Sequence, residues 1–275
     1  MKQIVPRIPK YLGPELQRAA IQTQLAIVAG DFAHASVLAK AEDTLRRADP
    51  HLEPVYAFHY EHAVQEIQID LEVGDATAAQ HAAAGFVARS DAWATQATDD
   101  TDLSLYFARL SYSTRESPPA EFETRRRAWI DARVAAGAYL GRIWSYAYAA
   151  TALTESEAHA ALDVRPRFGM SPGTPAGIYV GSPDAELGRI NLLSGNVDEA
   201  IVPLKRAVAA CDLYDAPVEH VRAALDLGRA LEKKGDPAGA CEAYGKVLAQ
   251  WGNAKPRSVT ADAAGARVKA LACKP

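Results

Sequence analysis

The sequence predicts an all-α protein built as an array of antiparallel helical hairpins, and three observations support this prediction. Alanine is abundant, and long stretches are rich in Leu, Arg, Glu, Gln and Lys, residues that lose little entropy in a helix. Short Gly-Asp, Gly-Asn and Pro signals interrupt these stretches. The interruptions recur with a period of about 40 residues, which is typical of stacked hairpins.

Two segments near the C-terminus show the repeat most clearly. Residues 187–208 read LGRINLLSGNVDEAIVPLKRAV, and residues 227–248 read LGRALEKKGDPAGACEAYGKVL. In each, we expect the Gly to end one helix in the left-handed conformation and the Asn or Asp after it to cap the next helix. We expect Ala200 and Ala240 where the two helices approach closely, because a larger side chain would push them apart.

The same turn signal occurs earlier in the chain. The four signals are Gly30-Asp31, Gly74-Asp75, Gly195-Asn196 and Gly235-Asp236. Their successive spacings are 44, 121 and 40 residues, and 121 is close to three periods. The long gap holds two further breaks, one at Pro118-Pro119 and one at Thr154, where Thr-Glu-Ser-Glu is expected to begin a helix with a capped first turn. The period therefore predicts about five to six hairpins.

The domain organisation follows from one stretch that is not helical in composition. Residues 164–183 read VRPRFGMSPGTPAGIYVGSP, with four prolines and four glycines. We expect a degenerate helical-hairpin region over 1–163, a crossing loop over 164–183, and a hairpin pair with a C-terminal capping helix over 184–275. Ser258 or Thr260 is expected to cap this last helix. Its expected buried stripe consists of Val259, Ala263, Ala266, Val268, Ala270 and Leu271.

The repeated segments resemble the tetratricopeptide repeat (TPR). Residues at the spacing of that repeat are Leu227, Gly228, Leu231, Gly235, Ala240 and Tyr244, and likewise Leu187, Gly188, Gly195, Ala200, Leu204 and Ala207. The chain departs from the pattern at Asn191, where a large apolar residue is usual, and at Asp212 and Gly252, where a Pro is usual. The resemblance covers about residues 184–251 and implies a TPR-like superhelical array.

The end of the chain, WGNAKPRSVTADAAGARVKAL, resembles the C-terminal TPR region that is appended to Ser/Thr protein kinases and signalling proteins of myxobacteria and their relatives. This resemblance implies a regulatory or partner-binding role in bacterial signalling. The implied partner is a protein or peptide, a kinase domain in the same or another chain among them.

Composition argues against several other classes of protein. The formal net charge is -4 and the pI about 6.0, whereas nucleic-acid surfaces are usually basic. Three cysteines without a CxxC pair favour a reducing, cytoplasmic location over a disulfide-built domain. No run of about 18 apolar residues occurs, so we expect no membrane span.

The sequence offers no convincing catalytic, cofactor or metal site. Neither a P-loop nor the Gly-rich loop of a kinase is present. Residues 169–173 fit G-x-S-x-G, but Pro172 lacks the backbone N–H that the oxyanion hole of such a site requires. His59, His62 and Glu66 share one face of a helix, yet three ligands on one exposed helix rarely hold a metal, and we interpret them as a polar face.

An aromatic-rich region precedes the crossing loop. It contains Trp129, Tyr139, Trp144, Tyr146 and Tyr148. We expect these side chains to fill a helical core. The alternative is an aromatic-lined pocket, which would make the chain a small-molecule-sensing helical domain.

The strongest candidate for partner binding is a pair of arginines at equivalent places of the two repeats. Arg189 and Arg229 each follow a Leu-Gly and are expected on the groove side of successive inner helices, where two guanidiniums could clamp a carboxylate. The predicted partner-binding residues are Arg189, Arg222, Arg229, Glu232 and Lys233. The alternative is that the two arginines pair with neighbours such as Glu186 and Asp226. The sequence therefore predicts a non-enzymatic interaction or scaffold module.

Overall fold

A computed structural model describes residues 13–48, 56–90, 103–112, 118–169, 183–211 and 213–274, with side chains throughout these ranges except at 56–62 and 90. The described residues form helices joined by turns and contain no strand, which confirms the all-α prediction. The first eight α-helices are α1 (Pro14–Val28), α2 (Phe32–Ala48), α3 (Tyr56–Glu72), α4 (Ala76–Ser90), α5 (Ser104–Leu110), α6 (Ala120–Ala135), α7 (Leu140–Trp144) and α8 (Glu155–Val164). A π-helix η2 (Ser145–Ala149) follows α7, and a 3₁₀ turn η3 (Arg165–Phe168) follows α8. The remaining helices are α9 (Pro183–Leu193), α10 (Val197–Ala209), α11 (Pro217–Lys233), α12 (Pro237–Trp251) and α13 (Val259–Ala270).

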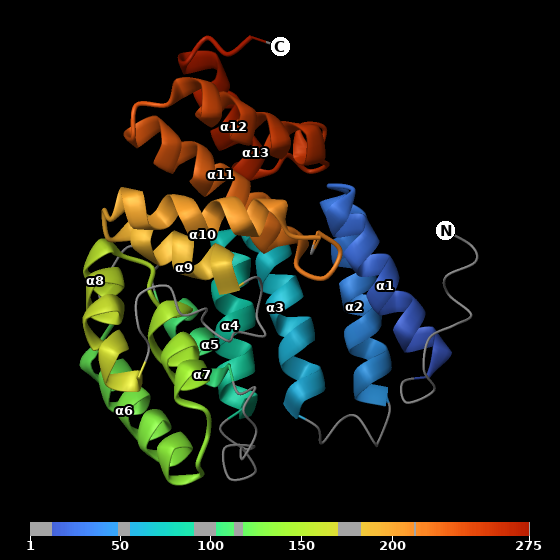
Figure 1. Cartoon of the computed structure of the whole chain (residues 1–275). Coiled ribbons are helices and arrows are strands. Elements are labelled where there is room, and N and C mark those ends of the chain that lie inside the picture. The colour runs from blue at the N-terminus through green and yellow to red at the C-terminus, as the bar shows by residue number, and fades with distance from the viewer. Residues whose placement is uncertain are drawn as a thin grey trace.

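Helices adjacent in sequence pack against each other, among them α1 with α2, α3 with α4, α9 with α10, α10 with α11 and α11 with α12. In Figure 1, α9 and α10 run crosswise to α3 and α4, and α11 to α13 lie at the end of the molecule opposite α6. No helix in the described part of the chain is both long and apolar enough to cross a membrane.

The predicted turn signals lie where two helices meet. Gly30, Gly74, Gly195 and Gly235 have φ values of 71°, 82°, 83° and 83°, the left-handed region that glycine adopts without strain. The carboxylates after three of them accept hydrogen bonds from the next helix: Asp31 from His34, Asp75 from Ala78 and Asp236 from Gly239. Asn196 makes no such side-chain bond.

The Leu-Gly pair of each C-terminal repeat is explained by close helix packing. A Cβ at Gly188 would overlap the side chain of Leu204, and a Cβ at Gly228 would overlap the ring of Tyr244. Ala200 and Ala240 are fully buried, as their expected place between two helices requires. Small residues at these positions therefore let the two helices of a hairpin approach each other.

The first hairpin packs against the last one. The backbone N–H of Lys255 donates to Gly30 O at 2.8 Å, and Trp251 Nε1 donates to Ile27 O at 3.0 Å. The rings of Phe32 and Trp251 meet edge to face with centroids 5.1 Å apart. In an open solenoid each repeat contacts only its neighbours, so these contacts distinguish the chain from a simple linear array.

The two main cores cross the expected domain boundary. The core of the C-terminal helices includes Phe32 and Ile69, and the core of α3 to α8 includes Ile190. Residues 170–182 of the predicted crossing loop lie outside the described residues, and 164–168 are helical. The proposed division of the chain into regions stays a prediction.

The last helix is capped as predicted, and its expected buried stripe is found in part. Ser258 accepts a hydrogen bond from the N–H of Ala261. Of the expected stripe, Ala263, Val268 and Leu271 are partly buried against the core, whereas Val259, Ala266 and Ala270 are exposed. The fully buried residues of this helix are Thr260, Ala261 and Ala264, and Thr260 donates a hydrogen bond to Glu72.

Candidate functional site: a charged groove along α9, α11 and α13

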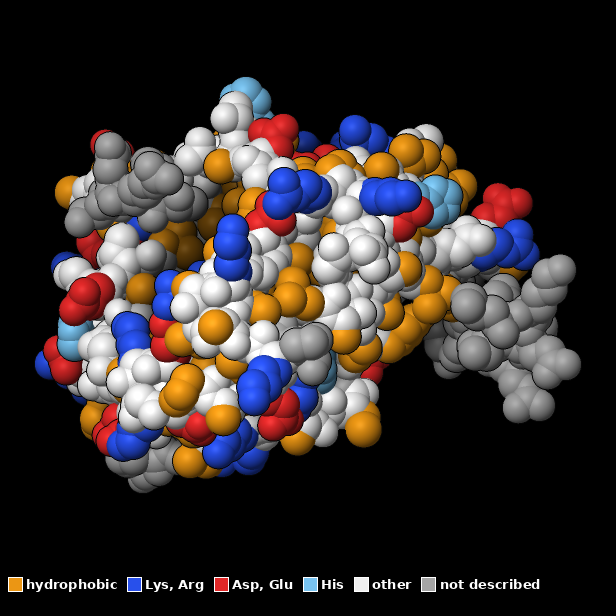
Figure 2. All heavy atoms as spheres, turned by 90° about the horizontal axis from the view of Figure 1, so that it is seen from above, with side chains coloured by type: hydrophobic (Ala, Val, Ile, Leu, Met, Phe, Trp, Pro, Cys, Tyr) orange, Lys and Arg blue, Asp and Glu red, His pale blue; other side chains and the backbone are white. Residues whose placement is uncertain are grey.

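A hollow of about 690 Å³ opens between α9, α11 and the last helix. Its lining consists of three leucines and six charged residues: Leu153, Arg189, Leu192, Leu193, Asp226, Arg229, Glu232, Lys233 and Arg267. Four of the five predicted partner-binding residues therefore lie in one place. Figure 2 looks onto the end of the molecule formed by α11 to α13, where Lys, Arg, Asp and Glu side chains are interspersed among hydrophobic ones.

The fifth predicted residue, Arg222, lies in a smaller hollow of about 160 Å³. This hollow lies between α3, α5, α9 and α11, and its polar lining residues are Gln68, Tyr106, Glu186, Arg189, Glu219, Arg222 and Asp226. Leu153, Arg189 and Asp226 line both hollows. The two hollows thus adjoin each other at these residues, and we call them together the charged groove.

The helix α11 supplies most of the charges of the charged groove because of its sequence spacing. Glu219, Arg222, Asp226, Arg229 and Lys233 follow one another at intervals of three and four residues, which places them on one face of a helix. The opposite face carries buried apolar residues, among them Val221, Ala224, Leu225 and Leu231. The sequence thus contained the signal for Glu219 and Asp226, which the analysis did not select as site residues.

The two repeat arginines pair with acidic neighbours. Arg189 binds Glu186, with Nε–Oε2 at 3.1 Å, and Arg229 binds Asp226, with Nη1–Oδ1 at 3.0 Å. This is the alternative arrangement that the sequence left open. In both pairs the carboxylate stands three residues before the arginine, so the repeat is preserved in the ion pairs as well.

Arg189 has a second set of partners that Arg229 lacks. Its Nη1 donates to Ala152 O at 2.9 Å and its Nη2 to Ala149 O at 2.8 Å, at the end of the π-helix η2. Most N–H groups of Arg189 are thus used within the protein, whereas the side chain of Arg229 is 49% exposed. A ligand carboxylate would therefore find its donors on Arg229 rather than on Arg189.

Arg222 joins the charged groove to a buried carboxylate. Its Nε donates to Glu72 Oε1 at 2.6 Å. Glu72 is fully buried and also accepts from Ser258 Oγ at 2.9 Å and Thr260 Oγ1 at 2.8 Å. Three elements far apart in the sequence thereby meet at one side chain. Nothing in the sequence near Glu72 indicates this, because its partners are more than 140 residues away.

At the other end of the charged groove, α13 contributes Arg267 to the lining. Arg267 Nε donates to Glu232 Oε2 at 3.0 Å, and Tyr244 Oη donates to the same oxygen at 3.0 Å. The bond from Arg267 is the main cause that lowers the pKa of Glu232. The pKa of Tyr244 is raised to about 12, mainly by burial and to a smaller extent by its hydrogen bond to Glu232. The sequence analysis missed Arg267 because its helix follows the repeats.

Burial also changes the acidity of groups in the smaller hollow. Burial raises the pKa of Glu219, although the nearby charge of Arg222 acts in the opposite direction. Burial also raises the pKa of Asp226, although Arg229 acts in the opposite direction. Burial raises the pKa of Tyr106 to about 12. A neighbouring positive charge would therefore stabilise the ionised carboxylates of this hollow.

The aromatic region is packed as a core, as the sequence predicted for most of it. Trp144 and Tyr146 are buried, and Trp144 Nε1 donates to Ala161 O at 2.7 Å. Tyr139 differs from the prediction, because it is 62% exposed. Tyr106, rather than Trp144, is the aromatic residue of the enclosed part of the charged groove.

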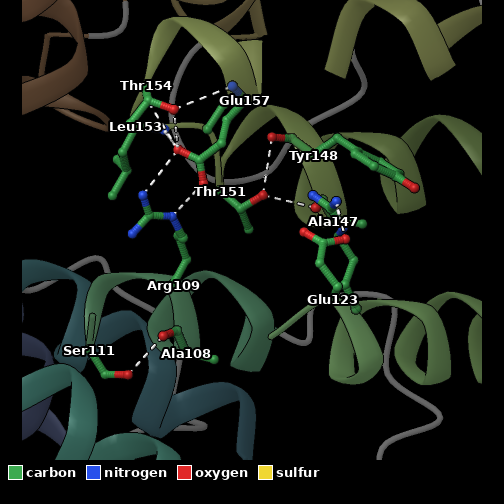
Figure 3. A network of polar contacts seen from close by, with 12 residues as sticks. Ala108, Arg109, Ser111, Glu123, Ala147, Tyr148, Thr151, Leu153, Thr154 and Glu157 are labelled. Carbon is green, nitrogen blue, oxygen red and sulfur yellow. Dashed lines mark hydrogen bonds and ion pairs between the residues drawn. The ribbon is translucent and has the colours of Figure 1, made fainter. Parts of the chain in front are cut away.

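A second polar network joins α5 to α8 (Figure 3). Arg109 is fully buried, and its Nη2 donates to Glu157 Oε2 at 3.0 Å. The same oxygen accepts from the backbone N–H groups of Leu153 and Thr154, each at 3.0 Å. Thr154 in turn caps α8 and completes the predicted capping box. The side chains of His59 and His62 lie outside the described residues, and their interpretation stays a prediction.

The C-terminus carries a disulfide that the sequence analysis did not expect. Cys241 of α12 and Cys273 after α13 are bonded, with Cα atoms 5.7 Å apart, and Cys211 is free and exposed. Disulfides persist mainly in oxidising compartments, whereas the cysteine count favoured a reducing one. A cytoplasmic location stays a prediction.

Comparison with known proteins gives no assignment: no family model matches the chain, and no curated protein matches it.

Proposed function

We propose that this chain is a non-enzymatic interaction module that binds a segment of a partner protein in the charged groove. The observation that supports this proposal most is the convergence of the predicted residues: Arg189, Arg222, Arg229, Glu232 and Lys233 line two adjoining hollows. A hollow of about 690 Å³ lined by leucines and exposed cations is suited to an extended segment with acidic side chains.

The groove residues have different roles in the proposed binding. Arg229 and Lys233 present exposed charges that can form bidentate or single hydrogen bonds with carboxylates. Leu192 and Leu193 supply apolar contact beside them. Arg189 is a positioning residue in this scheme, because it fixes α9 against the π-helix η2 through backbone carbonyls.

The resemblance of the C-terminal repeats to the TPR regions of myxobacterial-type kinases supports a regulatory place in bacterial signalling. In this proposal the TPR-like arrangement presents the groove, and the partner segment belongs to a signalling protein such as a kinase domain. The chain is proposed to act in the cytoplasm.

The experiment is a pull-down with three forms of the chain as bait: wild type, Arg229→Glu/Lys233→Glu, and Lys234→Glu. Lys234 is a matched control because it is exposed beside Lys233 but pairs with Asp198, outside the lining of the groove. Captured proteins are identified by mass spectrometry, and the leading one is purified and titrated against each form by calorimetry.

A partner that binds wild type and Lys234→Glu equally, and the double variant at least about tenfold more weakly, supports the proposal. Circular dichroism must first show that the three baits are equally folded. Equal affinity for all three forms, or no partner of wild type that the calorimeter confirms, contradicts the proposal.

A further inference from the structure

The charges along the charged groove are arranged with opposite sign at its two ends. At the enclosed end three carboxylates, Glu186, Glu219 and Asp226, face two guanidiniums. At the open end four cations, Arg189, Arg229, Lys233 and Arg267, face two carboxylates. The enclosed end therefore has an excess of negative charge and the open end an excess of positive charge.

Most of these charged side chains form ion pairs within the protein. Arg189 binds Glu186, Arg229 binds Asp226, and Arg267 binds Glu232. Arg222 binds Glu72, which lies outside the lining of the groove. Among the described residues, Glu219 and Lys233 form no ion pair within 4.0 Å and are the groove charges left over.

Glu219 has a polar neighbour that does not neutralise it. The side-chain amide of Gln68 on α3 donates to one of its oxygens. The carboxylate is thereby oriented at the wall of the smaller hollow, beside Tyr106. Glu219 is half-buried, and a carboxylate that is partly removed from water and has no ion-pair partner gains more from an incoming cation than a fully exposed one does.

The distance between the two unpaired charges sets the size of the matching ligand. Glu219 and Lys233 are 14 positions apart on α11, which corresponds to about 21 Å along the helix axis. An extended segment rises about 3.3 Å per residue, so about six to seven residues span this distance. Both positions lie on the groove face of α11, as their place in the lining shows.

We infer that the charged groove is selective for a partner segment of about seven residues with a cationic side chain at one end and carboxylates at the other. The cation occupies the smaller hollow against Glu219 and Tyr106, and the carboxylates meet Lys233 and Arg229. This inference rests on the proposed function and adds the charge order of the segment.

Glu219 and Lys233 could also stabilise α11 itself, since Glu219 lies in the first turn of the helix and Lys233 in the last, where they interact favourably with the helix dipole. A binding assay separates ligand recognition from this effect, because helix stability does not depend on which peptide is offered.

The probes are three fluorescein-labelled heptapeptides with blocked termini: Lys-Lys-Ala-Leu-Ala-Glu-Glu, Glu-Glu-Ala-Leu-Ala-Glu-Glu and Lys-Lys-Ala-Leu-Ala-Lys-Lys. Affinity is measured by fluorescence anisotropy at low ionic strength.

Wild type is expected to bind the peptide with ends of opposite charge at least about tenfold more tightly than either of the others. In Lys233→Glu both ends of the groove carry carboxylates, so the peptide with two basic ends should become the preferred ligand. Glu219→Gln should abolish the preference for the mixed peptide over the acidic one. Lys234→Glu should behave as wild type.

Binding of all three peptides with equal affinity would overturn the inferred charge order and leave the proposed function standing. The same holds if Lys233→Glu keeps the preference of wild type. If wild type binds none of the peptides at concentrations up to about 1 mM, a range that includes weak recognition, the groove is not a peptide site and the proposed function fails with the inference.

Discussion

The side chain of Thr260 donates a hydrogen bond of 2.8 Å to the carboxylate of Glu72, 188 positions earlier in the chain. Glu72 is the last residue of α3 and Thr260 lies in the first turn of α13, so this bond joins the second hairpin to the capping helix. Ser258 and Arg222 bind the same carboxylate. The wall of the charged groove formed by α11 is thereby tied to α3 and to the start of α13.

Removing this carboxylate should strongly destabilise the fold. In Glu72→Ala, Arg222 loses its ion-pair partner and two buried hydroxyls lose their acceptor, so we expect the free energy of unfolding to fall by about 3–5 kcal/mol. Glu72→Gln keeps an acceptor for the hydroxyls and should lose less. Urea denaturation measures both, with Glu242→Ala as control, because Glu242 is exposed and makes only a surface pair with Lys246. Equal stability of the Glu72 and Glu242 variants would refute this role.

Close helix packing predicts opposite effects for two glycines of the same hairpin. Gly228→Ala should destabilise by about 1–3 kcal/mol, because its Cβ overlaps the ring of Tyr244. Gly245→Ala should stabilise by about 0.5–1 kcal/mol, since nothing lies within 4 Å of its Cβ and Ala favours the helix. Thermal unfolding of the two variants compares them directly. A Gly228→Ala protein as stable as wild type would show that the hairpin is less tightly packed than described.

The disulfide between Cys241 and Cys273 closes a sequence separation of 32 residues. Titration of thiols in denaturant without reductant should find one thiol, that of Cys211, and three after reduction. Reduction should lower the free energy of unfolding by about 3–4 kcal/mol, the loop-closure entropy of such a bond. Cys211→Ser serves as control and should change neither the stability nor its response to reductant. Three free thiols in the untreated protein would show that the bond does not form.

The ionisation of Asp70 should make the free energy of unfolding depend on pH. Burial, together with Glu66 and Asp75, raises the pKa of Asp70 to about 6 from an ordinary value of 3.8. The folded chain thus binds this proton more tightly than the unfolded chain, so the charge costs stability above about pH 6. This cost disappears as the pH falls through the range from about 6 to 3.8.

Asp70→Asn should therefore be more stable than wild type at pH 7 by about 1 kcal/mol, and the gain should vanish near pH 4. Chemical denaturation at four pH values between 4 and 7 measures the difference, with the exposed Asp131→Asn as control. A gain that stays constant over this range would show that it does not come from the ionisation of Asp70.

Local features of the chain were readable because they depend on residues close in sequence. The glycine turns, the capping box at Thr154 and the spacing of Arg222, Arg229 and Lys233 on one helix face all follow from helix geometry. The place of Arg189 and Arg229 on equivalent helices follows from the repeat in the same way. The sequence also indicated their pairing with Glu186 and Asp226 as one of two arrangements.

The contacts between distant parts of the chain are visible only in the tertiary structure. Glu72, Arg267 and Tyr106 reach the charged groove or its wall through partners far away in sequence, and the first hairpin meets the last through Phe32 and Trp251. The periodicity of the sequence does not predict such pairings, because it indicates which face of a helix is buried but not which residues cover that face. The hairpins were thus determined locally, and the charged groove was determined by how helices far apart in the sequence pack together.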